Sequence, residues 1–322
     1  MLYLVLIFTI FLSFTMGYIY RARGIPFFGK WKTPFMGVRT EYSIGIGVGN
    51  TIDEIQHNST LVLSRYDVKD VNADFVADPF LFYRAGKWYM FMEVFNKSRN
   101  LGEIGMATSS DGLKWAYQSI VLREPFHLSY PYVFDYKDEI WMIPETGKDN
   151  SIRLYRALDF PRRWKLEKKL LTGKPYTDAS IFQHKGLWWI FASCNISRDL
   201  ILYFSKELTG PWKMHTCSPV VYYQPQKARC AGRVVIINGK LIRFAQDCSK
   251  EYGKSVQAFC VECLDKESYK ETPLKKYPVL SAAGQNWNAD GMHHIDLHLL
   301  EDGSYFAAVD GWKTVRDFGL KY

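Results

Sequence analysis

The sequence predicts an all-β protein, a five-bladed β-propeller preceded by a single N-terminal transmembrane helix. Three features predict it: an uncharged run at the start, an internal repeat, and an aromatic-rich composition. Of the 322 residues, 48% are hydrophobic, 16% aromatic and 23% charged, which excludes disordered, collagen-like and polytopic membrane proteins. We therefore divide the chain into a transmembrane signal anchor (1–22), a linker with first strands that pack on the propeller (23–69), and the five-bladed propeller (70–322).

The first element is the anchor. Leu2 to Tyr20 contains no charged residue, and a helix of that length spans roughly 28 Å, close to the thickness of a bilayer core. A cleaved secretory signal is the alternative. No basic segment precedes the run and no clear small-x-small cleavage site follows it, so an uncleaved anchor and a single-pass membrane protein are favoured.

Two conflicting patterns bear on which side of the membrane holds the body of the protein, meaning the chain after the anchor. Basic residues follow the run and pull this flank toward the cytoplasm, whereas potential N-glycan acceptors matter only in a lumenal or extracellular body. An even number of cysteines permits disulfides there. We expect the body to lie in the Golgi or ER lumen or outside the cell. The basic residues are Arg21, Arg23, Lys30 and Lys32; the acceptors are Asn58, Asn96 and Asn195; the cysteines are Cys194, Cys217, Cys230, Cys248, Cys260 and Cys263.

The repeat organises the rest of the chain. Segments beginning at Asp78, Tyr130 and Asp178 align without gaps, at steps of 52 and 48 residues. Weaker copies run from Gly232 to Phe244 and from His294 to Phe306. Each copy has an aromatic run, a tight turn and a second aromatic run, which is typical of a β-hairpin.

A second strand pair follows each hairpin and carries a recurring aromatic residue. Trp115, Trp164 and Trp212 are 49 and 48 residues apart. Four strands in each unit of about 50 residues indicate a propeller blade. For these aromatics, packing between blades is favoured over sugar stacking.

In a propeller the innermost strands line the central channel, so the residues that open each repeat converge at one mouth. This set is chemically mixed, whereas scaffold residues should be alike between blades, so we expect a binding site. The opening residues are Asp78, Tyr130, Asp178, Arg233 and His293 or His294; the second strands end with Glu93, Glu145, Gln246 with Asp247, and Asp310.

Paired carboxylates across a polar channel are suited to acid and base catalysis on a glycosidic bond, one protonated and the other ionised. Arg233 is suited to binding a phosphate or a carboxylate through two hydrogen bonds. The alternative is a structural cluster in which Arg233 pairs with Asp78 and Asp178.

Three other motifs do not indicate a metal or nucleotide site. His294, Asp296 and His298 share a strand face but give poor tetrahedral geometry, Cys260-Val-Glu-Cys263 is a single CxxC pair, and the glycines of 45–49 lack the GxGxxG spacing. We predict no metal and no cofactor. The net charge, 41 − 33 = +8, suits a phosphorylated head group or an anionic membrane and is too diffuse to indicate nucleic acid.

Several motifs carry a resemblance to known families. Ala77-Asp-Pro-Phe80, Asp178-Ala-Ser-Ile-Phe182 and Ser109-Ser-Asp-Gly-Leu-Lys-Trp115 resemble five-bladed glycoside hydrolases of the arabinanase, levansucrase and invertase kind. An ordered string is more similar to the amino-terminal domain of plant glucosamine inositolphosphorylceramide transferases and its bacterial relatives, and it covers roughly residues 70 to 312. The string is Ser129-Tyr-Pro-Tyr-Val-Phe134, Met142-Ile-Pro-Glu-Thr146, Asp178-Ala-Ser-Ile-Phe182, Ala231-Gly-Arg-Val-Val235 and Ala245-Gln-Asp-Cys-Ser249.

The resemblance implies a carbohydrate-active propeller in glycan or glycosphingolipid assembly or processing. The hydrolase pattern implies Asp78 as general base, Asp178 as the residue that tunes the acid, and a glutamate as the acid, for which Glu145 and Glu93 are the candidates. The implied partners are a glycan or glycolipid substrate and the membrane. The other hypothesis is a non-catalytic glycan-recognition module that works with a separate glycosyltransferase.

Overall fold

The computed structural model describes residues 37–194 and 198–317. The expected anchor at 1–22 and the acceptor Asn195 lie outside the described residues. Within the described part, no helix has the length and apolar character needed to cross a membrane. The chain divides into two compact units, residues 40–313 and residues 1–39 with 314–322, and the account below concerns the first.

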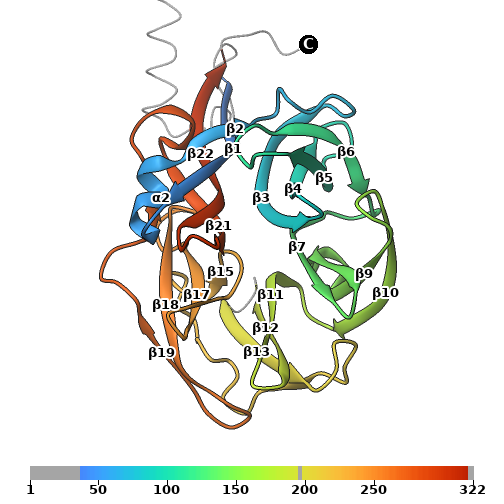
Figure 1. The fold of residues 1–322 in the computed structure, drawn as a ribbon, viewed down its shortest axis with the longest axis vertical. Coiled ribbons are helices and arrows are strands. Elements are labelled where there is room, and N and C mark those ends of the chain that lie inside the picture. Colours follow the sequence, from blue (N-terminus) through green and yellow to red (C-terminus); the bar gives the residue numbers. More distant parts are fainter. Residues whose placement is uncertain (1–36, 195–197, 318–322) are drawn as a thin grey trace, which may run out of the picture. The chain divides into compact units, whose positions relative to one another are not determined.

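Five antiparallel sheets surround a common centre (Figure 1), which confirms the predicted all-β five-bladed propeller. The first four blades follow chain order, and each starts with its innermost strand at the centre. The first blade comprises β3 (Ala73–Arg84), β4 (Lys87–Asn96), β5 (Leu101–Ser109) and β6 (Ala116–Leu122), and the second comprises β7 (Ser129–Tyr136), β8 (Glu139–Thr146), β9 (Ser151–Asp159) and β10 (Arg163–Thr172). The third comprises β11 (Tyr176–His184), β12 (Leu187–Cys194), β13 (Asp199–Ser205) and β14 (Lys213–Met214). The fourth comprises β15 (Arg229–Cys230), β16 (Val235–Ile237), β17 (Lys240–Asp247), β18 (Ser255–Leu264), β19 (Tyr269–Pro273) and β20 (Leu280–Ser281).

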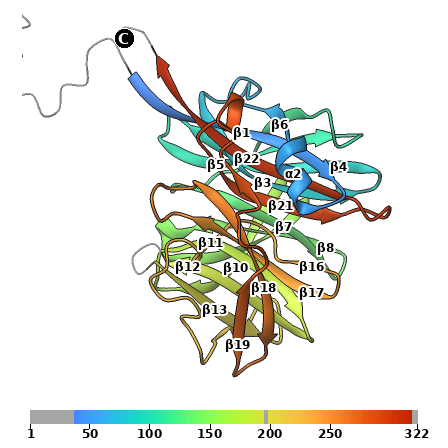
Figure 2. The same cartoon turned by 90° about the vertical axis from the view of Figure 1, so that its left-hand side faces the viewer.

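The fifth blade joins the two ends of the propeller chain. Its order is β2-β1-β22-β21, with β1 (Gly37–Gly49) and β2 (Thr60–Leu63) from the start and β21 (Gly291–Leu299) and β22 (Tyr305–Asp317) from the end. Figure 2 shows β1 beside β22. The stretch 23–69, in which we expected strands packing on the propeller, thus supplies both outer strands of this blade. Between them lies the helix α2 (Ile52–Asn58).

A β-bulge recurs at one position in the inner strands. The register of β3, β7, β11 and β21 against the second strand skips two residues, after Ala77, Ser129, Thr177 and Gly291. The first bulged residue has a positive φ in three blades: 52° at Asp78, 47° at Tyr130 and 49° at Asp178. Because bulges redirect side chains, the residues that open each repeat point away from the regular ladder.

The recurring tryptophans lie at the opposite end of the blades from these bulges. The Nε1 atoms of Trp115, Trp164 and Trp212 donate to backbone carbonyls of Gly112, Pro161 and Leu208 at 2.7, 3.0 and 3.2 Å. All three rings are half-buried and pack against core clusters. Each indole therefore closes the turn between the two outer strands, a packing role.

The centre of the propeller is closed below the bulges. The hydroxyl of Tyr130 donates to the carbonyl of Gly232 at 3.0 Å and accepts from its N–H at 2.6 Å. Ser180 Oγ also donates to the Gly232 carbonyl, at 2.9 Å. Gly232 (φ 137°) approaches β21 so closely that a Cβ would lie 1.8 Å from the Ile295 carbonyl oxygen. The site above this layer therefore has a floor.

We predict that Gly232→Ala destabilises the propeller by about 3 kcal/mol or prevents folding, because the methyl group has no space and the backbone is strained. Gly303→Ala is the matched control: its φ is 83° but nothing lies within 4 Å of the new Cβ, so only strain of about 1–2 kcal/mol applies. Urea unfolding followed by tryptophan fluorescence checks this. Equal midpoints for the two variants would contradict the close approach.

Candidate functional site

Ionisable side chains from all five blades gather above this floor, at the end of the propeller where the inner strands begin. Asp78 and Asp178 stand on bulges, and Glu93 and Glu145 stand near the ends of the second strands β4 and β8. The fourth blade contributes Arg229 and Gln246, and the fifth His293 and Asp310. We call these eight residues the axial cluster.

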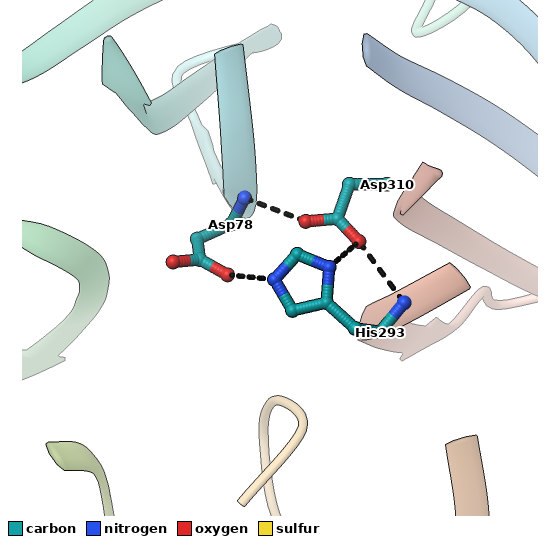
Figure 3. Close-up of side chains that lie close together, drawn as sticks. All are labelled: Asp78, His293 and Asp310. Atoms are coloured by element: carbon teal, nitrogen blue, oxygen red, sulfur yellow. Dashed lines mark hydrogen bonds and ion pairs between the residues drawn. The ribbon is translucent and has the colours of Figure 1, made fainter. Parts of the chain in front are cut away.

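His293 lies between two aspartates (Figure 3). Its Nδ1 is 2.8 Å from Asp310 Oδ1, and its Nε2 is 3.2 Å from Asp78 Oδ1. Asp310 Oδ2 also accepts from the Asp78 N–H at 2.9 Å. All three side chains are buried. One imidazole therefore links the innermost strands of the first and last blades.

The electrostatics of this trio follow from its composition. Burial lowers the pKa of His293, but the two carboxylates outweigh it and hold that pKa well above the usual value. Burial raises the pKa of Asp78, yet His293, His294 and Arg229 hold it below the usual value. Asp78 is therefore ionised at neutral pH beside an imidazolium.

Metal binding was tested on the same trio. Donor atoms of Asp78, His293 and Asp310 all lie within 4.8 Å of one another, a spacing that suits a cation. A metal needs the neutral imidazole, whereas the flanking carboxylates favour its protonated form. A cation bound there would displace that proton.

Asp178 is held by the fourth blade. Arg229 Nε donates to Asp178 Oδ2, which also accepts from Gln246 Nε2 at 3.0 Å. The Asp178 N–H donates to Glu145 Oε2 at 3.3 Å, and Arg229 Nη2 is 3.7 Å from that same oxygen. Glu145 thus shares a cation with Asp178 and lies directly beside it.

The two glutamates differ from the aspartates in protonation. Burial, and then the charge of Asp178, raise the pKa of Glu145 well above its usual range. Burial, and then the charge of Asp78, do the same for Glu93, whose Oε1 is 3.3 Å from His127 Nε2. The surroundings therefore push the pKa values of the two glutamates up and that of Asp78 down.

Aromatic rings and a cavity flank the cluster. Tyr42 contacts the His293 ring edge-on at 5.2 Å and Phe75 at 5.4 Å, and Phe75 stacks on Phe95 at 5.1 Å. The Arg229 guanidinium lies 4.9 Å from the ring of Tyr252, whose centroid is 5.5 Å from that of the His293 ring. Arg229 and Tyr252 line a cavity of about 290 Å³, near the lower bound for small-molecule sites of about 300 Å³. Such surroundings suit the apolar faces of sugar rings.

Arg233, which the sequence also suggested, lies outside the axial cluster. Arg233 is deeper: its Nε is 2.8 Å from Asp296 Oδ1 and its Nη2 donates to the Val133 and Leu81 carbonyls at 3.0 and 3.4 Å. Leu81 is three residues beyond Asp78, about 10 Å along the strand. Asp178 is paired with Arg229, so the structural cluster that we considered, in which Arg233 pairs with Asp78 and Asp178, is not formed.

Tyr130, His294 and Asp247 also have structural contacts. The Tyr130 side chain belongs to the floor, although its N–H donates to Asp78 Oδ2 at 3.3 Å. The ring of His294 packs edge-on against Phe80, and its Nε2 is 3.0 Å from the Pro79 carbonyl oxygen. Asp247 Oδ1 accepts from the Ser249 N–H at 2.9 Å in the turn after β17.

A known protein family matches most of this chain. The family model described as glucosamine inositolphosphorylceramide transferase 1, N-terminal, matches residues 57–312. The chain belongs to this family. Curated members named glucosamine inositolphosphorylceramide transferase 1 are 42% identical over 250 residues in Oryza sativa subsp. japonica and 35% identical over 265 residues in Arabidopsis thaliana. These matches cover 74% and 79% of this chain but only 33% and 34% of the relatives, so the chain spans about a third of their length.

Solved structures show the same fold at low identity. A thermostable family-43 glycoside hydrolase superposes with a TM-score of 0.54 at 14% identity, covering 78% of this chain and 95% of that one. A family 117 glycoside hydrolase from Zobellia galactanivorans gives 0.51 at 13%, covering 79% and 89%. A family 32 β-fructofuranosidase from Bombyx mori gives 0.54 at 16%, covering 75% and 58%. This chain therefore has the propeller fold that is also found in glycoside hydrolases.

We predict that the imidazole of His293 stays protonated at neutral pH while that of His127 is neutral. The carboxylates raise the first pKa, and burial lowers the second. Side-chain ¹⁵N chemical shifts measured across pH distinguish the two rings. Asp310→Asn should lower the pKa of His293. A His293 that titrates near 6.5 in the parent would contradict the ion-pair assignment.

The raised pKa of His293 also makes the free energy of unfolding depend on pH. Because the pKa of His293 is raised in the folded state, protonation of His293 stabilises the fold. This contribution to the free energy of unfolding is fully present below the unfolded-state pKa of about 6.5 and is lost as the pH rises through the folded-state pKa. His293→Gln should remove this part of the pH dependence of the free energy of unfolding.

Proposed function

We propose that this propeller is a carbohydrate-active domain that acts in the assembly or processing of glycosphingolipids or other glycans, with the axial cluster as its site. Supporting this is a single feature of the site: neighbouring charges hold the pKa of Asp78 below its usual value, while burial and the charge of Asp178 hold the pKa of Glu145 well above its usual value. Two carboxyl groups whose pKa values are pushed apart are the signature of an acid and base pair. The relatives' printed name and the glycoside hydrolase fold agree with this class of substrate.

In the proposed reaction, Glu145 donates its proton to the glycosidic oxygen as the bond to the anomeric carbon breaks. Asp78 accepts the proton of the attacking O–H group, which belongs to water in hydrolysis and to an acceptor sugar in transfer. Asp178 keeps Glu145 protonated through its charge and orients it through its N–H. Arg229 and Gln246 hold Asp178 in place.

The second candidate is a glycan-recognition module without catalysis, working with a separate glycosyltransferase. The observation that favours it is the coverage: about two thirds of each curated relative lies outside the match, so a transferring domain can reside there. In this reading the cluster presents fixed hydrogen-bonding groups to the glycan, and the aromatic walls hold its rings.

We further propose that residues 1–22 anchor the protein as a single-pass membrane protein with a lumenal or extracellular body. The uncharged run from Leu2 to Tyr20 supports the anchor. The two described acceptors differ in burial: Asn58 is exposed, with its Nδ2 donating to the Val48 carbonyl at 2.9 Å, whereas Asn96 is buried, with its Nδ2 donating to Glu103 Oε2 at 3.1 Å. A glycan fits the folded protein at Asn58 and does not fit at Asn96.

If the domain is catalytic, Glu145→Gln and Asp78→Asn should each lower turnover of a glycosphingolipid panel by about 10² or more, since an amide neither donates nor accepts the required proton. Binding should stay within about tenfold, since the shape is kept. Glu139→Gln is the control, because Glu139 lies on the same strand β8 but pairs with Arg156 at the other end. Activity of the parent should fall as pH rises through the raised pKa of Glu145.

Absence of turnover in the parent, with glycan binding that Arg229→Ala weakens by about 1.5–3 kcal/mol, would favour the recognition module. Loss of neither turnover nor binding in these variants would remove the axial cluster from consideration.

N-glycosylation tests the proposed membrane orientation separately. In a eukaryotic host, Thr60→Ala should remove one N-glycan by destroying the Asn58 acceptor, and Ser98→Ala should leave the mass unchanged. Ser98→Ala keeps the hydrogen bond to Asn96 Oδ1, which comes from the Ser98 N–H. The readout is the mass before and after treatment with an N-glycan-removing enzyme. A parent without any N-glycan, together with proteolysis from the cytoplasmic side, would reverse the proposed orientation.

A further inference from the structure

One histidine outside the axial cluster lies directly against it. His127 is in the loop between the first and second blades, and its Nε2 is 3.3 Å from Glu93 Oε1. On the other side of the ring, Nδ1 accepts a hydrogen bond from the backbone N–H of Gly102 at 2.9 Å. Glu93 lies on β4 and Gly102 on β5 of the first blade. The imidazole therefore connects this loop and two strands to a glutamate of the site.

The contact with Gly102 fixes the tautomer of His127. A backbone N–H only donates, so Nδ1 must accept and carries no proton. A neutral imidazole then has its proton on Nε2, the nitrogen that faces Glu93. A second proton on Nδ1 would face the Gly102 N–H, and burial also lowers the pKa of His127. His127 therefore presents an N–H group to Glu93 Oε1, at a distance slightly longer than the usual hydrogen bond of about 2.7–3.2 Å.

Close packing around Gly102 holds the ring in this place. A Cβ atom at Gly102 would lie 2.7 Å from Glu93 Oε1, 2.7 Å from His127 Cε1 and 2.3 Å from the Leu128 carbonyl oxygen. The Leu128 N–H donates to the Gly102 carbonyl at 3.0 Å, which joins the loop to β5. Only glycine fits at the centre of this unit, so neither the imidazole nor the carboxyl group has room to turn toward β5.

The two carboxyl oxygens of Glu93 have different surroundings. Oε1 is enclosed beside His127 Nε2, whereas Oε2 makes no hydrogen bond to the described residues and keeps access to solvent. Burial, and then the charge of Asp78, raise the pKa of Glu93 well above its usual value, which favours the carboxylic acid. Because Oε1 faces an N–H group, the proton of that acid belongs on Oε2. A carboxylic acid kept neutral in this way is an effective hydrogen-bond donor.

From this geometry we propose that His127 is a positioning residue for Glu93, and that Glu93 binds the substrate as a hydrogen-bond donor through Oε2. Glu93 pairs across the strands with Ala77, the residue before Asp78. The acceptor is therefore an oxygen atom of the glycan beside the O–H group that Asp78 deprotonates. The substrate rests on the proposed function, and the orientation of Glu93 rests on the contacts alone. The two glutamates then have different roles, since Glu145 gives up its proton and Glu93 keeps it.

Infrared spectroscopy tests the orientation without turnover. The difference spectrum between the parent and Glu93→Gln should show the loss of one carboxylic acid C=O band. His127→Phe keeps a ring near Phe95, whose centroid is 6.2 Å from that of His127, but it removes the donor, so this band should move to higher frequency. His127→Gln has an amide donor and should reverse most of the shift. His57→Phe, at an exposed position of α2, is the control and should leave the band in place.

A measurement on the parent alone supports the infrared comparison. Side-chain ¹⁵N chemical shifts should place the proton of His127 on Nε2, whether or not the variants fold. A proton on Nδ1 overturns the proposal. So does an acid band that survives Glu93→Gln, or a band that does not move in His127→Phe.

Binding to a panel of glycosphingolipid head groups tests the role toward the substrate. Glu93→Gln keeps one acceptor and one donor in the same shape, whereas Glu93→Met keeps only the size. Glu93→Met should therefore bind about tenfold more weakly than Glu93→Gln, and His127→Phe should bind more weakly than His127→Gln. Equal affinities of the two Glu93 variants overturn the donor role. A parent that binds no head group contradicts the proposed function and the donor role together, while the infrared bands still decide whether His127 orients Glu93.

Discussion

Closure of the ring by the pairing of β1 with β22 is the constraint on which the rest of the structure depends. A closed ring makes five inner strands share one centre, so the residues that open each repeat meet there although they are up to 215 positions apart, as Asp78 and His293 are. The recurring bulge then turns their side chains toward one another. Without the fifth blade, Asp78 would lose both His293 and its contact with Asp310.

Crowding of carboxylates is the direct result of this convergence, and it explains the chemistry of the site. Five carboxyl groups cannot all be ionised beside one arginine and one imidazolium in a buried place. The positive groups lie next to the aspartates, and the two glutamates remain to carry protons. The contrast between the lowered pKa of Asp78 and the raised pKa values of the glutamates therefore follows from where Arg229 and His293 stand.

The sequence was sufficient to predict the blades and to predict that several residues of the candidate site lie together. The 50-residue period identified the hairpins, and position within the period identified Asp78, Asp178, Glu93 and Glu145. It was insufficient where the period weakens. In the fourth blade the inner strand is only Arg229–Cys230. The repeat alignment therefore placed Arg233 at the opening position of this blade, where the structure has Arg229.

Other features were hidden from the sequence for physical reasons. Tyr42 comes from outside the repeat, and only ring closure brings it to His293. The burial of Asn96 depends on Glu103, a neighbour across the sheet. Protonation states depend on the whole group of neighbours, which no spacing rule gives.

The closing strands also have a mechanical consequence. The two ends of the propeller chain leave the ring from β1 and β22, so a force applied to those ends would act first on these two strands. Those strands carry Tyr42 and Asp310. A pull strong enough to separate them would dismantle the acid and base arrangement while the hydrogen bonds within the other four blades are still intact.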